Sequence, residues 1–140
     1  MAGFWVGIDL GTTFSSVCLY TPAGRQEFVT ITNSTNIPSV VSAPVNPEES
    51  YNVGFSAVKN RNTLVETKRL IGMKCENKNI QQLLRMQRED RPHFEGFKID
   101  DNDPNGRVRI AYEKRGVRVV KEPWKISAKI LKYLKEYALK

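Results

Sequence analysis

An apolar segment that ends in an acid and is followed at once by a turn of small residues limits the possible folds more than any other feature. Phe4–Asp9 is rich in aromatic and β-branched residues and is predicted to be a strand. The segment Leu10–Thr13 has turn chemistry, and Ser15–Tyr20 is predicted to be a second strand. Thr21–Gly24 turns the chain again before an alternating third segment, Gln26–Ile31. Because both connections are short, the sequence predicts an antiparallel meander.

The rest of the chain predicts a second group of elements. Asn33–Ser50 contains three prolines, which resist helix formation and most ladder pairing, so we expect an extended segment at a subdomain boundary. Helical spacing follows in Phe55–Asn60 and in Asn79–Arg88. Alternating residues then predict a small antiparallel sheet formed by three strands: Phe94–Ile99, Arg107–Tyr112 and Val117–Val120.

The last predicted element is a helix that begins at Pro123, a residue suited to the first helical turn. Apolar residues recur after it at helical spacing and are expected to form its packed face: Trp124, Ala128, Leu131, Leu134 and Ala138. The lysines between them are expected to face solvent: Lys125, Lys129, Lys132 and Lys135.

Composition excludes several classes of protein. No apolar run approaches the roughly 20 residues that span a bilayer, and the first residues carry no basic leader. Cys18 and Cys75 are far apart and only one histidine is present, so metal-ligand spacing is absent. A reduced, cytoplasmic protein is the simpler interpretation, although a disulfide between the two cysteines stays open.

Positive charge is concentrated after residue 60. The whole chain has 22 basic and 15 acidic residues, a net charge of +7, of which residues 1–60 contribute −2. A basic half can indicate binding to nucleic acid. Because the basic residues are scattered among acids and form no nucleic-acid motif, a solvated surface is favoured and no specific nucleic-acid partner is expected.

The turn after the first strand carries the candidate chemistry. Gly11 allows a tight turn in which successive amide groups point into one concavity suited to phosphate oxygens, and Thr12 and Thr13 add hydroxyl donors. Asp9 would face a phosphate-bound magnesium ion and hold its waters, because magnesium dehydrates reluctantly. The same residues also suit an ordinary hairpin, so the pattern alone leaves both interpretations open.

Two motifs resemble the heat-shock protein 70 (DnaK-type) chaperones. Val6–Ser15 closely resembles the opening signature of that family, and Lys68–Gly72 resembles a second family segment. Ile37–Val41 and Val53–Asn60, which lie between them, are similar to intervening family stretches. The resemblance covers nearly the whole chain and implies part of an actin-like ATPase (ribonuclease H-like) α/β fold, the first half of one lobe with its peripheral subdomain.

The resemblance also implies domain boundaries and residue roles. Residues 1–36 would begin the core subdomain, residues 37–120 would form the peripheral subdomain, and residues 121–140 would form a helix returning to the core. The nucleotide-binding residues would be Gly11, Thr12, Thr13 and Phe14, with Asp9 near magnesium through water and Lys68 as the catalytic lysine. Departures from the family pattern, such as Phe14 in place of tyrosine and Glu66-Thr67 in place of Asp-Ala, indicate a divergent member.

The implied function is that of an amino-terminal fragment of the ATP-binding and hydrolysing domain of a molecular chaperone. ATP or ADP with magnesium would be the cofactors, and nucleotide state would control binding of unfolded client peptides, with co-chaperones as further partners of the full-length protein. The fragment alone is expected to be inactive. Two alternatives stay open, an ATP-binding heat-shock-related nucleotide exchange factor and a sugar- or acetate-kinase-type enzyme. A P-loop NTPase is disfavoured because its motif is absent.

Overall fold

The first strands form the predicted antiparallel meander. In the computed structural model, which describes residues 3–44, 50–60 and 62–139, β1 (Trp5–Leu10) pairs with β2 (Phe14–Tyr20). The other edge of β2 pairs with β3 (Gln26–Phe28) and with β4 (Ile37–Pro38). The third strand ends at Phe28, before the predicted Ile31, and the chain then reverses at Thr32 and Asn33, which take left-handed backbone conformations.

Very short strands follow in the proline-containing segment. β5 (Val41–Ser42) lies between β6 (Asn52–Val53) and β7 (Thr63–Leu64), and both pairings are antiparallel. The helix predicted at residues 55–60 is a single turn, α1 (Phe55–Val58). The expectation of an extended segment at residues 33–50 agrees with these two-residue strands, while Pro47 lies outside the described residues.

The far end of the molecule combines one helix with a second small sheet. A 3₁₀ turn, η1 (Thr67–Leu70), leads to α2 (Lys78–Arg88), where the Asn77 side chain accepts a hydrogen bond from the amide of Asn79 as an N-cap. The strands β8 (Lys98–Asp100), β9 (Arg109–Lys114) and β10 (Val117–Lys121) pair antiparallel in the order β10-β9-β8. This arrangement confirms the predicted helix and sheet.

The predicted start of the first strand in this second sheet was wrong. Phe94–Phe97 is not part of β8, because the rings of Phe94 and Phe97 stack with centroids 4.4 Å apart and both side chains are buried. In a strand, residues 94 and 97 would point to opposite faces, because they are three positions apart. Here both side chains lie in the core. Strand pairing therefore begins only at Lys98.

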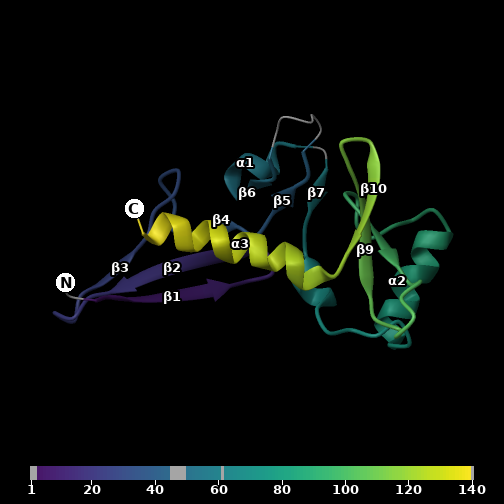
Figure 1. Ribbon diagram of the computed structural model, residues 1–140, viewed down its shortest axis with the longest axis horizontal. Helices are drawn as coiled ribbons and strands as arrows, with labels where there is room; N and C mark the ends of the chain where they lie inside the picture. The colour runs from purple at the N-terminus through teal and green to yellow at the C-terminus, as the bar shows by residue number, and fades with distance from the viewer. Residues whose placement is uncertain (1–2, 45–49, 61, 140) are drawn as a thin grey trace.

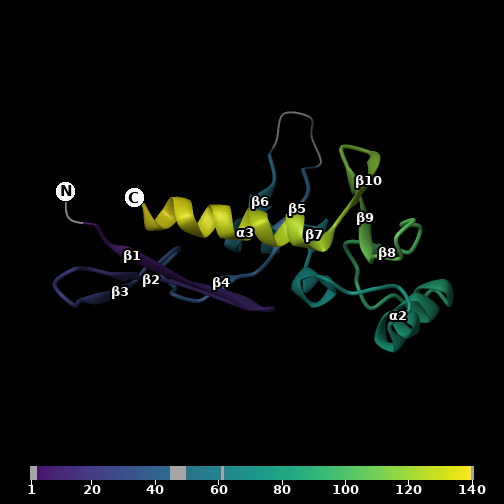
Figure 2. The ribbon, with the colours of Figure 1, turned by 60° about the horizontal axis from the view of Figure 1, so that its bottom comes forward.

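The long helix α3 (Pro123–Ala138) runs along the molecule and joins its two ends. Figures 1 and 2 both show α3 over the β1–β2 sheet, with its start beside the β9–β10 hairpin, and α3 contacts β1, β2, β5, β6 and η1. The ends of the chain labelled N and C lie at the same end of the molecule in both views.

The predicted packed face of α3 was wrong in its first half. Trp124 is 53% exposed and Leu131 is 39% exposed, and Ala128 is exposed as well. The buried residues of the helix are spaced three or four apart along a different stripe: Pro123, Ile126, Ser127, Ile130, Leu134 and Ala138. This stripe faces both β1–β2 and η1, so the bulky isoleucines occupy the space between them.

Three further observations complete the fold. Cys18 in β2 and Cys75 before α2 are free thiols. Within the described residues, no helix has the length and apolar character needed to cross a membrane. The core is continuous from Val17 in the first sheet, through Leu70 and Ile126, to Ile110 in the last sheet. One packed interior therefore holds the β1–β2 turn and η1 in fixed relation.

Candidate phosphate-binding site

The turn between β1 and β2 requires a glycine at its start. β1 ends at Leu10 and β2 begins at Phe14, so the connection consists of residues 11–13. A Cβ atom at Gly11 would overlap the carbonyl oxygen of Phe14. Any other residue there would force the backbone apart, because bonded geometry leaves the Cβ no other position. The tight turn expected from the sequence is therefore present, and Gly11 is the residue that permits it.

The turn leaves amide donors without partners. Among the loop and turn hydrogen bonds of the described residues, none uses the N–H of Gly11, Thr12 or Thr13 as donor. Thr13 and Phe14 are exposed, and Thr12 is half-buried. Consecutive amides with no acceptor among the described residues are suited to donate to a phosphate group.

A pair of serines anchors this turn to the rest of the protein. The amide of Ser39 donates to the carbonyl oxygen of Thr13 at 2.9 Å, and the Ser39 and Ser15 hydroxyl oxygens lie 2.7 Å apart in a buried hydrogen bond. Ser15 and Ser39 are 1% and 5% exposed, so this contact is shielded from water and rigid. The sequence analysis assigned Ser39 no role. Its position within Ile37–Val41, the segment similar to a family stretch, was the only feature that could have indicated one.

Asp9 lies two residues before the turn, near the end of β1. Its side chain is exposed and its Cα partner is Ser16 on β2. Ile8 and Leu10, its neighbours in β1, are the residues that pack against the core. Because side chains alternate along a strand, Asp9 lies on the opposite, open face of the sheet. A single exposed carboxylate can hold a magnesium ion through the waters of its hydration shell, which magnesium gives up reluctantly.

No cluster of three or more acidic, histidine or cysteine side chains forms a metal site within residues 3–44, 50–60 and 62–139.

Lys68 reaches the turn from a distant part of the chain. Its Nζ donates a hydrogen bond to the carbonyl oxygen of Leu10, the residue directly before Gly11. Lys68 lies on η1, where the neighbouring Thr67 and Leu70 are buried and fix the 3₁₀ turn against the core. The side chain of Lys68 is exposed, so its ammonium group points outward at the root of the hairpin. The structure thus brings together two segments that are 58 residues apart.

Glu66 and His93 support the segment that carries Lys68. Glu66 precedes η1 in a left-handed conformation, with φ of 57°. One carboxylate oxygen lies 3.6 Å from the Arg69 guanidinium, and the other lies 3.0 Å from Nε2 of His93. No sequence pattern indicates this bridge, because His93 is 27 residues away and falls in a loop.

The assembled residues fit a nucleotide phosphate. The amides of residues 11–13 and the carboxylate of Asp9 belong to one hairpin, and the Lys68 ammonium bonds to the Leu10 carbonyl of that hairpin. Amide dipoles and an ammonium group stabilise phosphate charge, and the acid suits a hydrated magnesium ion. By contrast, the cavity of about 590 Å³ between Gln87, Phe94 and Arg118 contains none of these residues in its lining.

Comparison with known proteins gives a consistent result. A family model described as Hsp70 protein matches residues 5–140. The chain is 31% identical over 137 residues to a heat shock protein of Pyricularia oryzae, an alignment that covers 95% of this chain and 20% of that protein. It is 31% identical over 140 residues to a ribosome-associated molecular chaperone of Saccharomyces cerevisiae, with coverage of 95% and 20%. It is also 32% identical over 147 residues to a chaperone protein HscA homolog of Azoarcus, with coverage of 95% and 19%. The chain spans about one fifth of the length of the curated relatives that it matches.

Proposed function

The chain belongs to the Hsp70 protein family, and we propose that it supplies the phosphate-binding hairpin and the hydrolytic lysine of an ATP-dependent molecular chaperone. The observation that carries the proposal is the hydrogen bond from Lys68 Nζ to the Leu10 carbonyl. This bond puts an ammonium group beside the turn, whose amides donate to no acceptor in the described part of the chain. Members of this family have the actin-like ATPase fold, and the mixed α/β architecture agrees with it.

In the proposed site, each residue has a separate task. The N–H groups of Gly11, Thr12 and Thr13 bind phosphate oxygens. Bound ATP would supply the γ-phosphoryl group that passes to water, with magnesium offsetting part of its charge. Lys68 orients the attacking water and stabilises the negative charge that develops on the phosphoryl oxygens. Asp9 holds waters of the magnesium shell, and Phe14 contributes its backbone to the turn.

The proposed domain organisation follows from the family. Residues 1–36 begin the core subdomain of one lobe, residues 37–120 form the peripheral subdomain, and residues 121–140 return to the core. The packing of α3 against both β1–β2 and η1 supports this assignment, because the helix connects the two groups of elements.

The proposed partners are those of a chaperone. In the full-length protein, ATP state would control binding of unfolded client peptides, and co-chaperones would act on the nucleotide cycle. We place this activity in the cytoplasm, although one similar protein is named a mitochondrial iron-sulfur cluster biogenesis chaperone.

An exchange factor that binds ATP without turnover is the second candidate. The exposed position of Lys68 at the hairpin favours hydrolysis. A protein that binds ATP only for structure does not require an ammonium group at the site of phosphoryl transfer. A turnover assay on the full-length protein separates the two functions. A kinase of sugar or acetate is disfavoured, because the family match covers residues 5–140.

The test is Lys68→Ala in the full-length protein. Single-turnover hydrolysis should fall at least about a hundredfold, the effect of losing one preorganised electrostatic group. ATP affinity should fall by less than about tenfold, or 1.4 kcal/mol, because the amides of the hairpin still bind phosphate.

Arg69→Ala is the matched control, since it removes the adjacent charge of the same turn. It should slow hydrolysis far less than Lys68→Ala does, because Arg69 bonds to Glu66 and not to the hairpin. Parent-level hydrolysis by a folded Lys68→Ala protein would show that Lys68 is an ordinary surface residue.

A further inference from the structure

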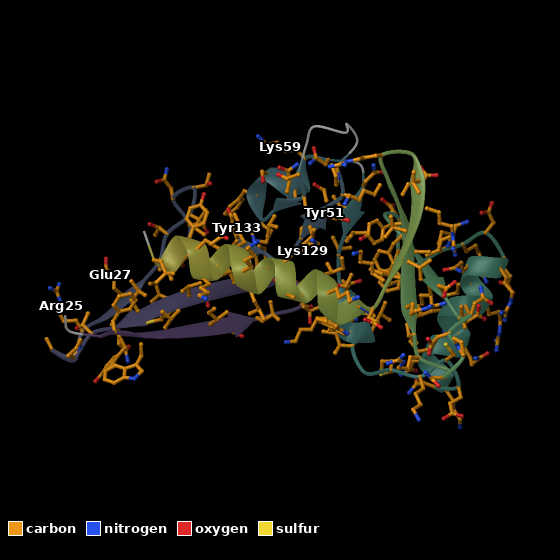
Figure 3. All side chains as sticks on the ribbon, in the orientation of Figure 1. Arg25, Glu27, Tyr51, Lys59, Lys129 and Tyr133 are labelled. Atoms are coloured by element: carbon orange, nitrogen blue, oxygen red, sulfur yellow. The ribbon has the colours of Figure 1, made fainter. Side chains whose placement is uncertain are left out.

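A second basic site lies away from the hairpin, between α3 and the segment Ser50–Val53, which includes β6. It is a cavity of about 340 Å³, here named the basic groove, and its lining is Ser50, Tyr51, Val53, Lys129, Lys132, Tyr133 and Glu136. Figure 3 shows the labelled side chains of Tyr51, Lys129 and Tyr133 gathered at the middle of α3. None of these residues takes part in the proposed ATP site.

Two lysines share one aromatic ring in this groove. The Nζ of Lys129 lies 4.0 Å from the centroid of the Tyr51 ring, and the Nζ of Lys114 lies 4.9 Å from the same centroid. The hydroxyl of Tyr51 forms a hydrogen bond of 3.0 Å with the hydroxyl of Tyr112, which holds the ring in place. The ring thus attracts two positive charges to one point on the surface.

These positive charges lack a carboxylate partner. Within the described part of the chain, Lys114, Lys129 and Lys132 form no salt bridge, and Glu136 forms none although it lines the groove. Burial lowers the pKa of Lys129, and the charges of Lys121, Lys114 and Lys132 lower it further. Like charges held together at a partly buried position are unfavourable unless an anion joins them.

Hydroxyl groups complete the set of donors. Tyr133 lines the groove and its hydroxyl carries a proton at neutral pH, as tyrosines do; burial and a hydrogen bond with Tyr137 raise its pKa to about 12. Ser50 adds a second hydroxyl to the lining. The groove therefore offers ammonium and hydroxyl donors within one small cavity.

We infer that the basic groove binds a phosphate-type dianion, carried on a phosphorylated protein side chain or present as free phosphate. Two ammonium groups from the lining, with Lys114 beside them, match a double negative charge better than the single charge of a carboxylate. A nucleic-acid strand fits less well, because stacking of bases needs an open aromatic face and the Tyr51 ring already holds two ammonium groups.

The test is a titration of the chain with inorganic phosphate at constant ionic strength, followed by NMR of labelled lysine side chains. We expect saturable shifts at Lys129 and Lys132. The amides of residues 11–13 are read in the same spectra, so phosphate at the hairpin is distinguished from phosphate in the groove. Chloride in place of phosphate should produce no saturable shift.

Lys129→Gln should weaken phosphate binding in the groove by about tenfold or more, the scale of one charge-assisted hydrogen bond. Lys135→Gln is the matched control, because it removes the same charge from an exposed lysine of α3 that does not line the groove. Its effect should stay below about twofold. If both variants lost the same amount of phosphate affinity while their circular dichroism stayed unchanged, the binding would depend only on the overall charge of the protein, and the inference would be wrong.

The source of the phosphate is distinguished by a phosphoserine peptide with alanine neighbours. Tighter binding of this peptide than of inorganic phosphate indicates a phosphorylated protein, and equal affinities indicate that any phosphate group is accepted. Glu48 and Glu49 precede Ser50 in the sequence and provide a last check. If only the Glu48→Gln, Glu49→Gln double variant bound phosphate, the chain's own acids would occupy the groove and the inference would be wrong.

Discussion

At the scale of single residues, the hairpin depends on one missing side chain. A Cβ at Gly11 would overlap the carbonyl oxygen of Phe14, and the backbone of the turn is held by the hydrogen bond from the Ser39 amide to the Thr13 carbonyl. The turn therefore has little freedom to adapt to a substitution.

Gly11→Ala should lower the free energy of unfolding by about 1–3 kcal/mol, because the turn must take a strained conformation. It should also shift the amide resonances of Thr12, Thr13 and Phe14 and weaken ATP binding. Urea unfolding and amide NMR would measure both effects.

Gly7→Ala is the matched control for that change. Its Cβ would lie 3.9 Å from the carbonyl oxygen of Cys18, which is ordinary van der Waals contact. It should leave the hairpin resonances in place. If Gly7→Ala shifted them as strongly as Gly11→Ala, the argument from close approach at Gly11 would fail.

At the scale of elements, α3 shows how one helix offers two candidate apolar stripes. The stripe through Trp124 and Leu131 faces solvent, and the stripe through Ile126, Ile130 and Leu134 is buried. The neighbouring residues Ile130 and Leu131 therefore form a natural comparison, since they have similar volume and opposite exposure.

Ile130→Ala should destabilise the protein by about 2–5 kcal/mol, because it leaves a cavity between α3 and the core. Leu131→Ala should cost less than about 1 kcal/mol, because its side chain already contacts water. Chemical unfolding of both variants would measure the difference. Equal costs would mean that α3 is rotated so that both stripes are equally buried.

Helix α2 was easier to predict from its sequence. Ile80 and Leu84 are buried four residues apart, in agreement with the helical spacing found over Asn79–Arg88, and the Gln87 side chain bonds to both the N–H and the C=O of Ile99. The side-chain amide of Gln87 thus satisfies the backbone groups of Ile99 in β8 that a neighbouring strand would otherwise bond. This contact accounts for a polar residue on the packed side of the helix.

At the scale of the whole molecule, resistance to acid depends on a buried carboxylate in the far sheet. Asp100 on β8 accepts hydrogen bonds from Arg109, from Asn102 and from Arg118. Burial by itself would raise the pKa of Asp100, but these hydrogen bonds outweigh it and hold the pKa below the ordinary value of 3.8.

A carboxyl group whose pKa is lower in the folded state stabilises the protein above its ordinary pKa, and this contribution is lost as pH falls through the folded-state value. Asp100→Asn should therefore cost about 3 kcal/mol near neutral pH, because Arg109 loses the charge that compensates its burial. The difference from the parent should shrink as pH falls below about 4. Urea unfolding at several pH values would measure this dependence.

Asp101→Asn is the control, since Asp101 is exposed and takes part in none of these hydrogen bonds. It should change stability little at any pH. A constant difference between the parent and Asp100→Asn down to about pH 2 would show that the charge of Asp100 is not what stabilises the sheet.

The local parts of this protein could be predicted from the amino-acid sequence alone. The meander, the tight turn at Gly11, the helix over residues 78–88 and the start of α3 at Pro123 follow from preferences that act over a few neighbouring residues. The family was also visible in the sequence, because its motifs are contiguous segments.

The contacts between distant segments emerged only from the packing of the whole chain. Apart from the family resemblance, nothing in its local sequence distinguishes Lys68 from a surface lysine, and the structure shows that packing of Thr67 and Leu70 brings it to the Leu10 carbonyl. The buried stripe of α3 arose in the same way, because it packs against β1, β2 and η1. In each case the deciding energy is the burial of apolar surface between segments far apart in the chain, and local preference carries no information about which segments will meet.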